Sequence, residues 1–347
     1  MNQTAQTPGL RGNQSMEVFR LIASILVIFA HVPFPGTVGP VLNCFARCSV
    51  PGFFAISGFF AYGASSKKLE KRIWNLAKLT AVAFGLELFY NCVLIELEGG
   101  SSIGYLRAMI PNAYEIANFV LLNVNFLRDT FWYLPAALEA MIGLWLYVRF
   151  REEEGQVNYG AFYIVGFCLF AVTLVLSTMG TGARNPGSIF QFRNGLFFGI
   201  PLMAMGLFLG QHWQRIVEKF ALTNGKLAAL VVLCLGLSLT EWFGFGICDV
   251  MVGSVTAVLF LMVLMAKNPT LSTRPGARKV LGTLGALSTA VYVLHSIVID
   301  CYERFLLGGF AGNPAEPWLR PLAVLAVTLV WAMAWVLVEN LLKKRKK

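Results

Sequence analysis

An arginine and a histidine flank the first hydrophobic segment of this chain, at Arg20 and His31. They are eleven positions apart, so an α-helix turning about 100° per residue brings the second side chain to within roughly 20° of the first. Both would lie on one helix face, about 16 Å apart along the axis. Because ionisable groups in a bilayer are costly, such residues indicate a function or a partner. A basic anchor and a proton-transferring imidazole on one face suit a long ligand.

Plainer interpretations of these residues stay open. Glu17 precedes Arg20 by three residues, so the two can pair on one helix face. The pair could lie at the membrane interface, with the Arg20 side chain extended toward water. His31 ends an apolar run and stands close to Pro33, so it could be an ordinary interfacial histidine.

Composition predicts a polytopic membrane protein. Hydrophobic residues make up 57% of the chain and charged residues 13%, with a mean hydropathy of +0.66, whereas soluble domains carry about 25% charged residues. The net charge of +10 does not indicate a nucleic-acid partner, because Lys and Arg cluster between the apolar segments as topology signals do. The seven cysteines form no Cys-x-x-Cys pair and there are three histidines, so no metal site is expected. A disulfide between Cys44 and Cys48 stays open.

The apolar segments predict an all-α integral membrane protein of about ten transmembrane helices. An even number of spans puts both termini on one side. Placing them in the cytoplasm gives the inner connections more than twice as many Lys and Arg residues as the outer ones, in line with the positive-inside rule. The predicted spans are near 17–34, 48–65, 73–95, 131–150, 159–178, 195–213, 226–243, 247–266, 280–300 and 321–340.

One membrane domain accounts for most of the chain. We expect a polar cytoplasmic N-terminus at 1–16, a transmembrane domain at 17–340 and a basic cytoplasmic tail at 341–347. An apolar patch at 116–127 is too short to span and would be re-entrant or interfacial. Long connections often carry function, and the predicted outer side has three of them, at about 96–130, 179–194 and 301–320.

Several motifs, taken in order, resemble the membrane acyltransferase-3 family. They begin with the Glu-x-x-Arg of Glu17 and Arg20, the Arg-x10-His spacing that ends at His31, and the Phe-Phe-x-x-Ser-Gly-Phe at 53–59, which a basic segment follows. The similarity continues through 193–201 and ends with Tyr-Val-Leu-His at 292–295, so it is spread over essentially the whole chain. Members of this family move acyl groups, often acetyl from acetyl-CoA, onto surface polysaccharides, lipid-linked glycans or small molecules.

The resemblance implies an integral-membrane O-acyltransferase with acyl-CoA as its donor and no metal. Arg20 and Arg72, with Lys68 and Lys71, would bind the phosphates of coenzyme A at a cytoplasmic mouth. Of the family's Arg-x-x-Arg pattern only the first position is matched, by Arg72, since the second holds Asn75. The same basic residues could equally serve to keep the hairpin inside.

His31 would then act on the acyl group, together with Arg20. An imidazole can take a proton from an attacking sugar hydroxyl, or it can accept the acyl group itself. Any of three acids, Glu87, Glu139 and Asp249, could orient it. The remaining supporting or substrate-binding residues implied by the resemblance are Glu17, Arg47, Arg193, Asn194, Tyr292 and His295. Tyr292 and His295 share a helix face, and a structural hydrogen bond between helices explains them equally well.

The acceptor would be a glycan or lipid-linked sugar at the outer side of a bacterial inner or plasma membrane. The alternative is a transporter of a small solute such as an amino acid. A related membrane region is fused to racemase domains in some glycopeptide-resistance proteins, where it resembles an amino-acid importer. Helices broken by Gly or Pro are common at transporter binding sites, and Gly199-Ile200-Pro201 is such a sequence.

Overall fold

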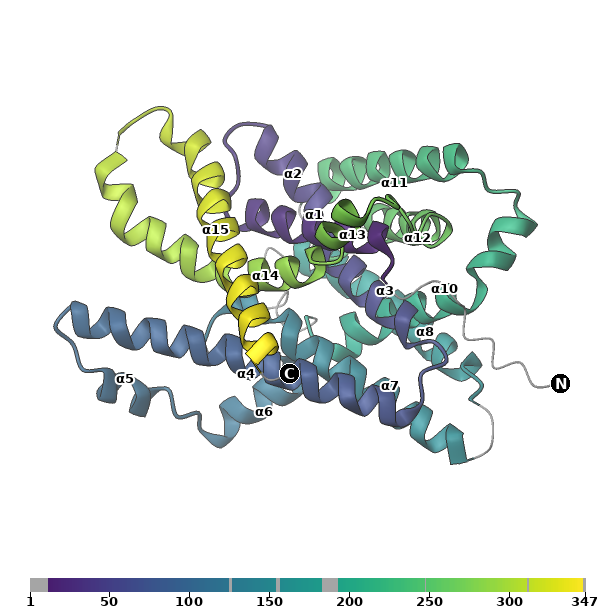
Figure 1. Ribbon diagram of the computed structural model, residues 1–347, viewed down its shortest axis with the longest axis horizontal. Coiled ribbons are helices and arrows are strands. Elements are labelled where there is room, and N and C mark those ends of the chain that lie inside the picture. The colour runs from purple at the N-terminus through teal and green to yellow at the C-terminus, as the bar shows by residue number, and fades with distance from the viewer. Residues whose placement is uncertain are drawn as a thin grey trace. The chain divides into compact units, whose positions relative to one another are not determined.

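The computed structural model describes residues 12–124, 127–153, 157–182, 193–246, 248–310 and 312–345. Every regular element within these ranges is a helix (Figure 1). The α-helices are α1 (Gln14–His31), α2 (Val38–Ala46), α3 (Ser49–Ala61), α4 (Ser66–Leu97), α5 (Ser102–Ala108), α6 (Ala113–Leu122), α7 (Tyr133–Glu153), α8 (Gly160–Gly182), α10 (Ile200–Lys219), α11 (Asn224–Phe245), α12 (Val252–Lys267), α13 (Pro275–Leu281), α14 (Leu284–Cys301) and α15 (Glu316–Arg345). Two π-helices lie at Gly195–Gly199 and Tyr302–Leu306, and short 3-10 helices at Asp129–Phe131 and Leu307–Phe310.

Eight segments of the described chain are long and apolar enough to cross a membrane. They include all but two of the predicted spans. The exceptions correspond to α12, a shorter apolar helix of 16 residues, and to α7, which carries Glu139 in its middle and charged residues at its end. The all-helical membrane architecture is therefore confirmed, while the count of ten and the cytoplasmic termini stay predictions.

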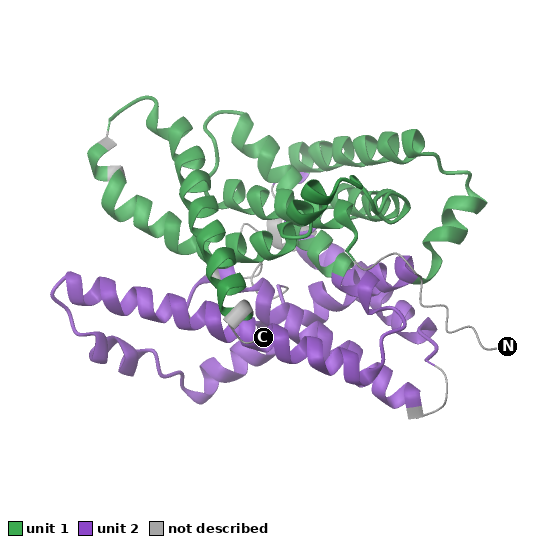
Figure 2. Ribbon diagram, in the orientation of Figure 1, with its two compact units in different colours: residues 1–56, 211–244, 251–347 green, residues 57–210, 245–250 purple. Residues whose placement is uncertain are grey.

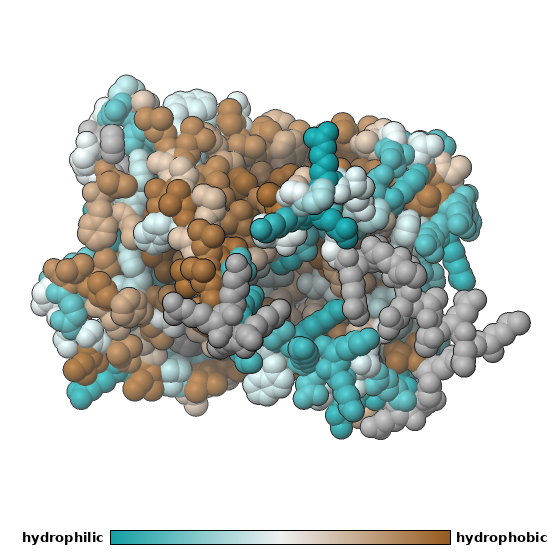
Figure 3. All heavy atoms as spheres, in the orientation of Figure 1, coloured by the Kyte–Doolittle hydropathy of each residue, from teal (hydrophilic) through white to brown (hydrophobic). Residues whose placement is uncertain are grey.

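Large apolar side chains are exposed along several of these helices. Phe167 on α8, Leu233 on α11 and Leu337 on α15 are 74%, 69% and 64% exposed. Figure 3 shows hydrophobic residues over much of the visible face. Extensive exposed apolar surface is unfavourable in water and is expected where helices contact lipid.

The chain divides into two compact units (Figure 2). Unit 1 consists of Met1–Ile56, Gln211–Gly244 and Met251–Lys347, and unit 2 of Ser57–Gly210 and Phe245–Val250. The first and last parts of the sequence therefore fold together in unit 1.

The core of unit 1 forms where α1, α14 and α15 pack together. Ile28 of α1 lies in one buried cluster with Val291 of α14 and with Val324 and Ala332 of α15. Small residues such as Ala332 let membrane helices approach closely, which strengthens dispersion contacts.

The start of α1 is fixed to the end of α12. The Asn13 side chain caps α1 by accepting from the Met16 amide at 3.0 Å, and it donates to the Met265 carbonyl at 3.0 Å. The backbone N–H of Gln14 donates to the Pro269 carbonyl at 2.8 Å. Because helix-terminal groups are otherwise left without partners, these bonds hold the end of α1 that carries Arg20.

In unit 2, Gly58 lets α3 lie directly against α10. A Cβ at position 58 would be 2.0 Å from the carbonyl oxygen of Met203. Only glycine fits so close an approach of two helix backbones. Gly58 in the second apolar segment therefore serves helix packing.

Candidate functional site

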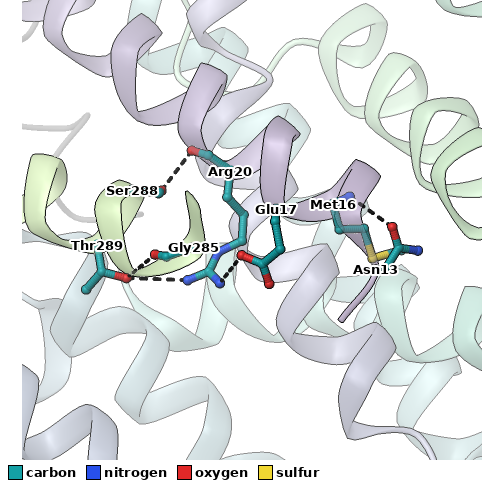
Figure 4. Close-up of polar contacts among 7 residues, drawn as sticks. All are labelled: Asn13, Met16, Glu17, Arg20, Gly285, Ser288 and Thr289. Carbon is teal, nitrogen blue, oxygen red and sulfur yellow. Dashed lines mark hydrogen bonds and ion pairs between the residues drawn. The ribbon is translucent and has the colours of Figure 1, made fainter. Parts of the chain in front are cut away.

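Arg20 lies between α1 and α14, held by groups from both helices (Figure 4). Its Nη1 is 3.3 Å from Oε2 of Glu17, as the three-residue spacing predicts, and its Nη2 donates to Oγ1 of Thr289 at 3.4 Å. The backbone is tied as well, since Oγ of Ser288 donates to the Arg20 carbonyl at 2.8 Å. Thr289 in turn donates its hydroxyl proton to the Gly285 carbonyl at 3.0 Å, so its oxygen acts as the acceptor for Arg20. The guanidinium is thus placed by side chains that themselves have partners.

Gly285 makes the space that the Glu17–Arg20 pair occupies. A Cβ at this position would be 1.9 Å from Oε2 of Glu17 and 2.8 Å from Nη1 of Arg20. Neither distance is sterically possible, so any larger residue must push the ion pair away from α14.

We therefore expect Gly285→Ala to move the Glu17 carboxylate and the Arg20 guanidinium, and because both are the ends of flexible side chains, the free energy of unfolding should fall by less than the about 1–3 kcal/mol that overpacking a rigid core costs. The measurement is the unfolding temperature of purified protein in detergent. Gly236→Ala is a matched control, because a Cβ on Gly236 in α11 would meet no heavy atom within 4 Å. A loss of more than about 3 kcal/mol relative to Gly236→Ala would contradict this expectation, because it would require rigid surroundings at Gly285.

His31 is the last residue of α1 and lies beside His295 of α14. The centres of the two imidazole rings are 5.5 Å apart, with 34° between the ring planes. His31 is exposed, whereas His295 is buried. Arg20 and His31 both contact α14, as their shared helix face predicts.

His295 is fixed by its own helix. Its Nδ1 is 2.6 Å from the carbonyl oxygen of Tyr292, and the Tyr292 and His295 rings are centred 5.7 Å apart. The predicted pairing of these two residues on one face is therefore a direct contact within α14.

Arg193 and Asn194 lie in unit 2, where both are held tightly. Nε and Nη2 of Arg193 donate to the Asp249 carboxylate at 2.9 and 2.6 Å, and the guanidinium lies 5.6 Å from the centre of the Trp132 ring. Asn123 donates to the Arg193 carbonyl at 2.7 Å.

Asn194 caps the π-helix Gly195–Gly199 by accepting from the Phe197 backbone amide at 2.8 Å. Arg193 and Asn194 shape the start of a π-helix, an element frequent at functional sites.

Each of the three acids predicted as partners for His31 has a partner in unit 2. Asp249 binds Arg193, as described above. Oε1 of Glu87 accepts from Nε of Arg128 at 2.6 Å, and Oε2 of Glu139 accepts from the Gly195 amide at 2.6 Å. Within unit 1, the His295 ring lies beside His31, and orientation of His31 by one of the three acids stays a prediction.

The predicted phosphate-binding residues lie at the start of α4, in unit 2. Lys68 and Lys71 are exposed, while Arg72 is half-buried and donates from Nη2 to the Phe60 carbonyl at 2.9 Å. Arg47 is half-buried at the C-terminal end of α2, in unit 1.

Cys44 and Cys48 are both free thiols. The Cys48 thiol donates to the Ser254 carbonyl, with sulfur and oxygen 3.6 Å apart. Across the described part of the chain, no group of three or more His, Cys, Asp or Glu side chains is arranged to hold a metal ion.

Sequence reasoning missed the residues of α14 that hold Arg20. Gly285, Ser288 and Thr289 are small or hydroxyl-bearing residues at helical spacing, a pattern that is typical of close helix packing in membranes. That pattern could have identified a contacting face on this helix, although not the helix that it contacts.

Comparison with known proteins gives a family and one distant relative. A family model described as an acyltransferase domain matches residues 13–337. A protein named amino-acid racemase, from Enterococcus faecalis, is 25% identical over 313 residues, which are 82% of this chain and 40% of that protein. This chain therefore spans less than half the length of that relative. No solved structure matches the chain.

Proposed function

Because this chain belongs to the acyltransferase family and is a multi-pass membrane protein, we propose that it is an O-acyltransferase using acyl-CoA, with acetyl-CoA as the first donor to test. Its acceptor is the hydroxyl group of a glycan or lipid-linked sugar at the outer side. The membrane is a bacterial inner or plasma membrane.

The observation that carries this proposal is the arrangement of Arg20 and His31 against α14. Arg20 offers a fixed guanidinium, which binds phosphate groups by charge-assisted hydrogen bonds. His31 lies further along the same helix, where a long and thin donor bound at Arg20 can place its reactive end. Acyl-CoA has a charged head group and a distant thioester, so its enzyme needs an anchor for the head group and a base at a fixed distance from that anchor.

In the proposed reaction His31 is the general base. It removes the proton of the acceptor hydroxyl as the hydroxyl oxygen attacks the thioester carbonyl. The carbon–oxygen bond forms, the carbon–sulfur bond breaks, and His31 returns its proton to the departing thiolate of coenzyme A. The products are an O-acyl ester and free coenzyme A, so no further reactant is needed.

Three basic residues of α4, Lys68, Lys71 and Arg72, are proposed phosphate contacts. They rest on the sequence resemblance and on the exposure of both lysines. Arg47, Arg193 and Asn194 are proposed supporting residues. For Arg193, the ion pair with Asp249 makes a positioning role more suitable than direct binding of an anion.

Amino-acid transport is the second candidate function. The match to a protein named amino-acid racemase favours it, because a membrane region associated with such an enzyme could move its substrate. This candidate requires passage of a solute and no acyl donor, so the two functions can be separated by experiment.

The deciding experiment uses the purified full chain. Radiolabelled acetyl-CoA is added in detergent, and saturable binding and release of labelled acetate are measured. Binding with slow turnover to water supports the acyltransferase. If folded protein shows neither, while proteoliposomes take up labelled amino acids without acetyl-CoA, the enzyme proposal is overturned.

A further inference from the structure

A second histidine, His295, lies beside His31 at the proposed reaction centre. His295 is fully buried on α14, among the buried apolar side chains of Val291, Leu294 and Val298. A polar ring is unfavourable in such surroundings unless its nitrogen atoms have partners.

The contact with Tyr292 sets the tautomer of His295. A carbonyl oxygen can only accept a hydrogen bond, so Nδ1, which lies 2.6 Å from the Tyr292 carbonyl, must carry a proton. In the neutral ring Nε2 then carries the lone pair. Because the bonded carbonyl is part of the same helix, the ring is held in one orientation.

His31 is arranged differently, although the two rings are only 5.5 Å apart. It is exposed at the end of α1, where its ring has access to reactants. The orientation of an exposed imidazole decides whether its lone pair faces the proton that it must remove. The fixed ring of His295, which lies beside it, is a neighbour that can limit this orientation.

We propose that His295 is a positioning residue for His31, an inference that rests on the proposed acyltransferase function. Its neutral ring, with the proton kept on Nδ1, orients the His31 imidazole and stabilises the positive charge that His31 gains from the acceptor hydroxyl. His295 itself neither gains nor loses a proton. His31 passes its proton to the thiolate of coenzyme A, and the pair returns to its starting state.

Two substitutions separate positioning from packing. His295→Gln keeps a donor for the Tyr292 carbonyl and a polar acceptor, whereas His295→Leu keeps only bulk. We expect His295→Leu to lower kcat by about 100-fold while changing the KM for acetyl-CoA less than about threefold. The kcat of His295→Gln should lie within about tenfold of that of the unchanged protein. Ser296→Ala, at the adjacent buried position, is the matched control and should leave kcat unchanged.

If His295 has only a structural role, the order of the two variants in kcat is reversed. In an apolar core Leu would be tolerated at least as well as Gln, and losses would follow the amount of folded protein. Equal kcat values for His295→Leu and the unchanged protein would overturn the inference. If the unchanged protein does not turn over acetyl-CoA at all, the proposed function fails instead.

A spectroscopic test needs no activity. The chain has three histidines, His31, His212 and His295, so the nitrogen NMR signals of labelled imidazoles can be assigned with single substitutions. We expect His295 to show a protonated Nδ1 and an unprotonated Nε2, and His295→Leu to shift the His31 signals while leaving those of His212 in place. Unchanged His31 signals in that variant would contradict the proposed coupling of the two rings.

Discussion

Replacing His31 with alanine is expected to abolish measurable acyl transfer while the protein still folds. General base catalysis by a positioned side chain contributes about 10²–10⁴-fold to a rate, so kcat should fall by that factor. His31 ends α1 as an exposed side chain, and its removal leaves no cavity in the core. The unfolding temperature should therefore change little. The measurement is acetyl release from acetyl-CoA by purified variants at equal amounts of folded protein.

His212→Ala is the matched control, since it removes a histidine from α10 that has no place in the proposed reaction. Both variants lose an imidazole, so any general effect of that loss on expression or detergent binding is shared. Full turnover by the His31 variant would rule out its role both as base and as acyl carrier. Equal losses in the two variants would point to a general effect on the membrane domain.

Hydrophobicity located the spanning helices because the length of a span depends on the bilayer and not on the rest of the fold. The first span was predicted at 17–34, whereas α1 ends at His31, shortly before Pro33, which cannot continue a helix. The apolar patch at 116–127 was judged too short to span, and its residues 116–122 belong to α6, a shorter apolar helix, while residues 125–126 lie outside the described part of the chain. The capping box of Asn112 and Glu115 marks the start of that helix.

The π-helix at Gly195–Gly199 could not be predicted from the sequence. Its first amide binds Glu139, more than 50 positions earlier in the chain. The hydrogen bond depends on how α7 packs, and a local pattern carries no information about that. The same reason explains why Arg193 and Asp249 were both noticed as charged residues but not as a pair.

Within the candidate site, the spacing of Arg20 and His31 predicted a shared face because helix periodicity is a local property. The helix that this face contacts was not predicted, since α14 lies more than 250 positions later. Glu87, Glu139 and Asp249 were proposed to orient His31 because carboxylates commonly do so. Each has a partner within unit 2, so a role in orienting His31 stays a prediction, and within unit 1 the His295 ring lies next to His31.

Replacing Arg20 with alanine is expected to weaken acetyl-CoA binding more than it slows the chemical step. A hydrogen bond to a charged group contributes about 1.5–3 kcal/mol, and each 1.4 kcal/mol is a factor of ten in affinity. The KM for acetyl-CoA should therefore rise about 10- to 100-fold, with a smaller change in kcat. The KM of Arg20→Lys should lie between that of the unchanged protein and that of Arg20→Ala, because lysine keeps the charge but lacks the planar guanidinium that binds two phosphate oxygens at once.

Arg20→Ala also leaves the Glu17 carboxylate without the guanidinium that it contacts at 3.3 Å. A negative charge left near the donor phosphates would repel them and exaggerate the loss. Adding Glu17→Gln to Arg20→Ala removes that charge, so the double variant reports the loss of the guanidinium alone. If its KM returns to the value of the unchanged protein, Arg20 serves to neutralise Glu17 and does not bind the donor. If the KM stays high in both variants, the guanidinium is the anchor for acyl-CoA.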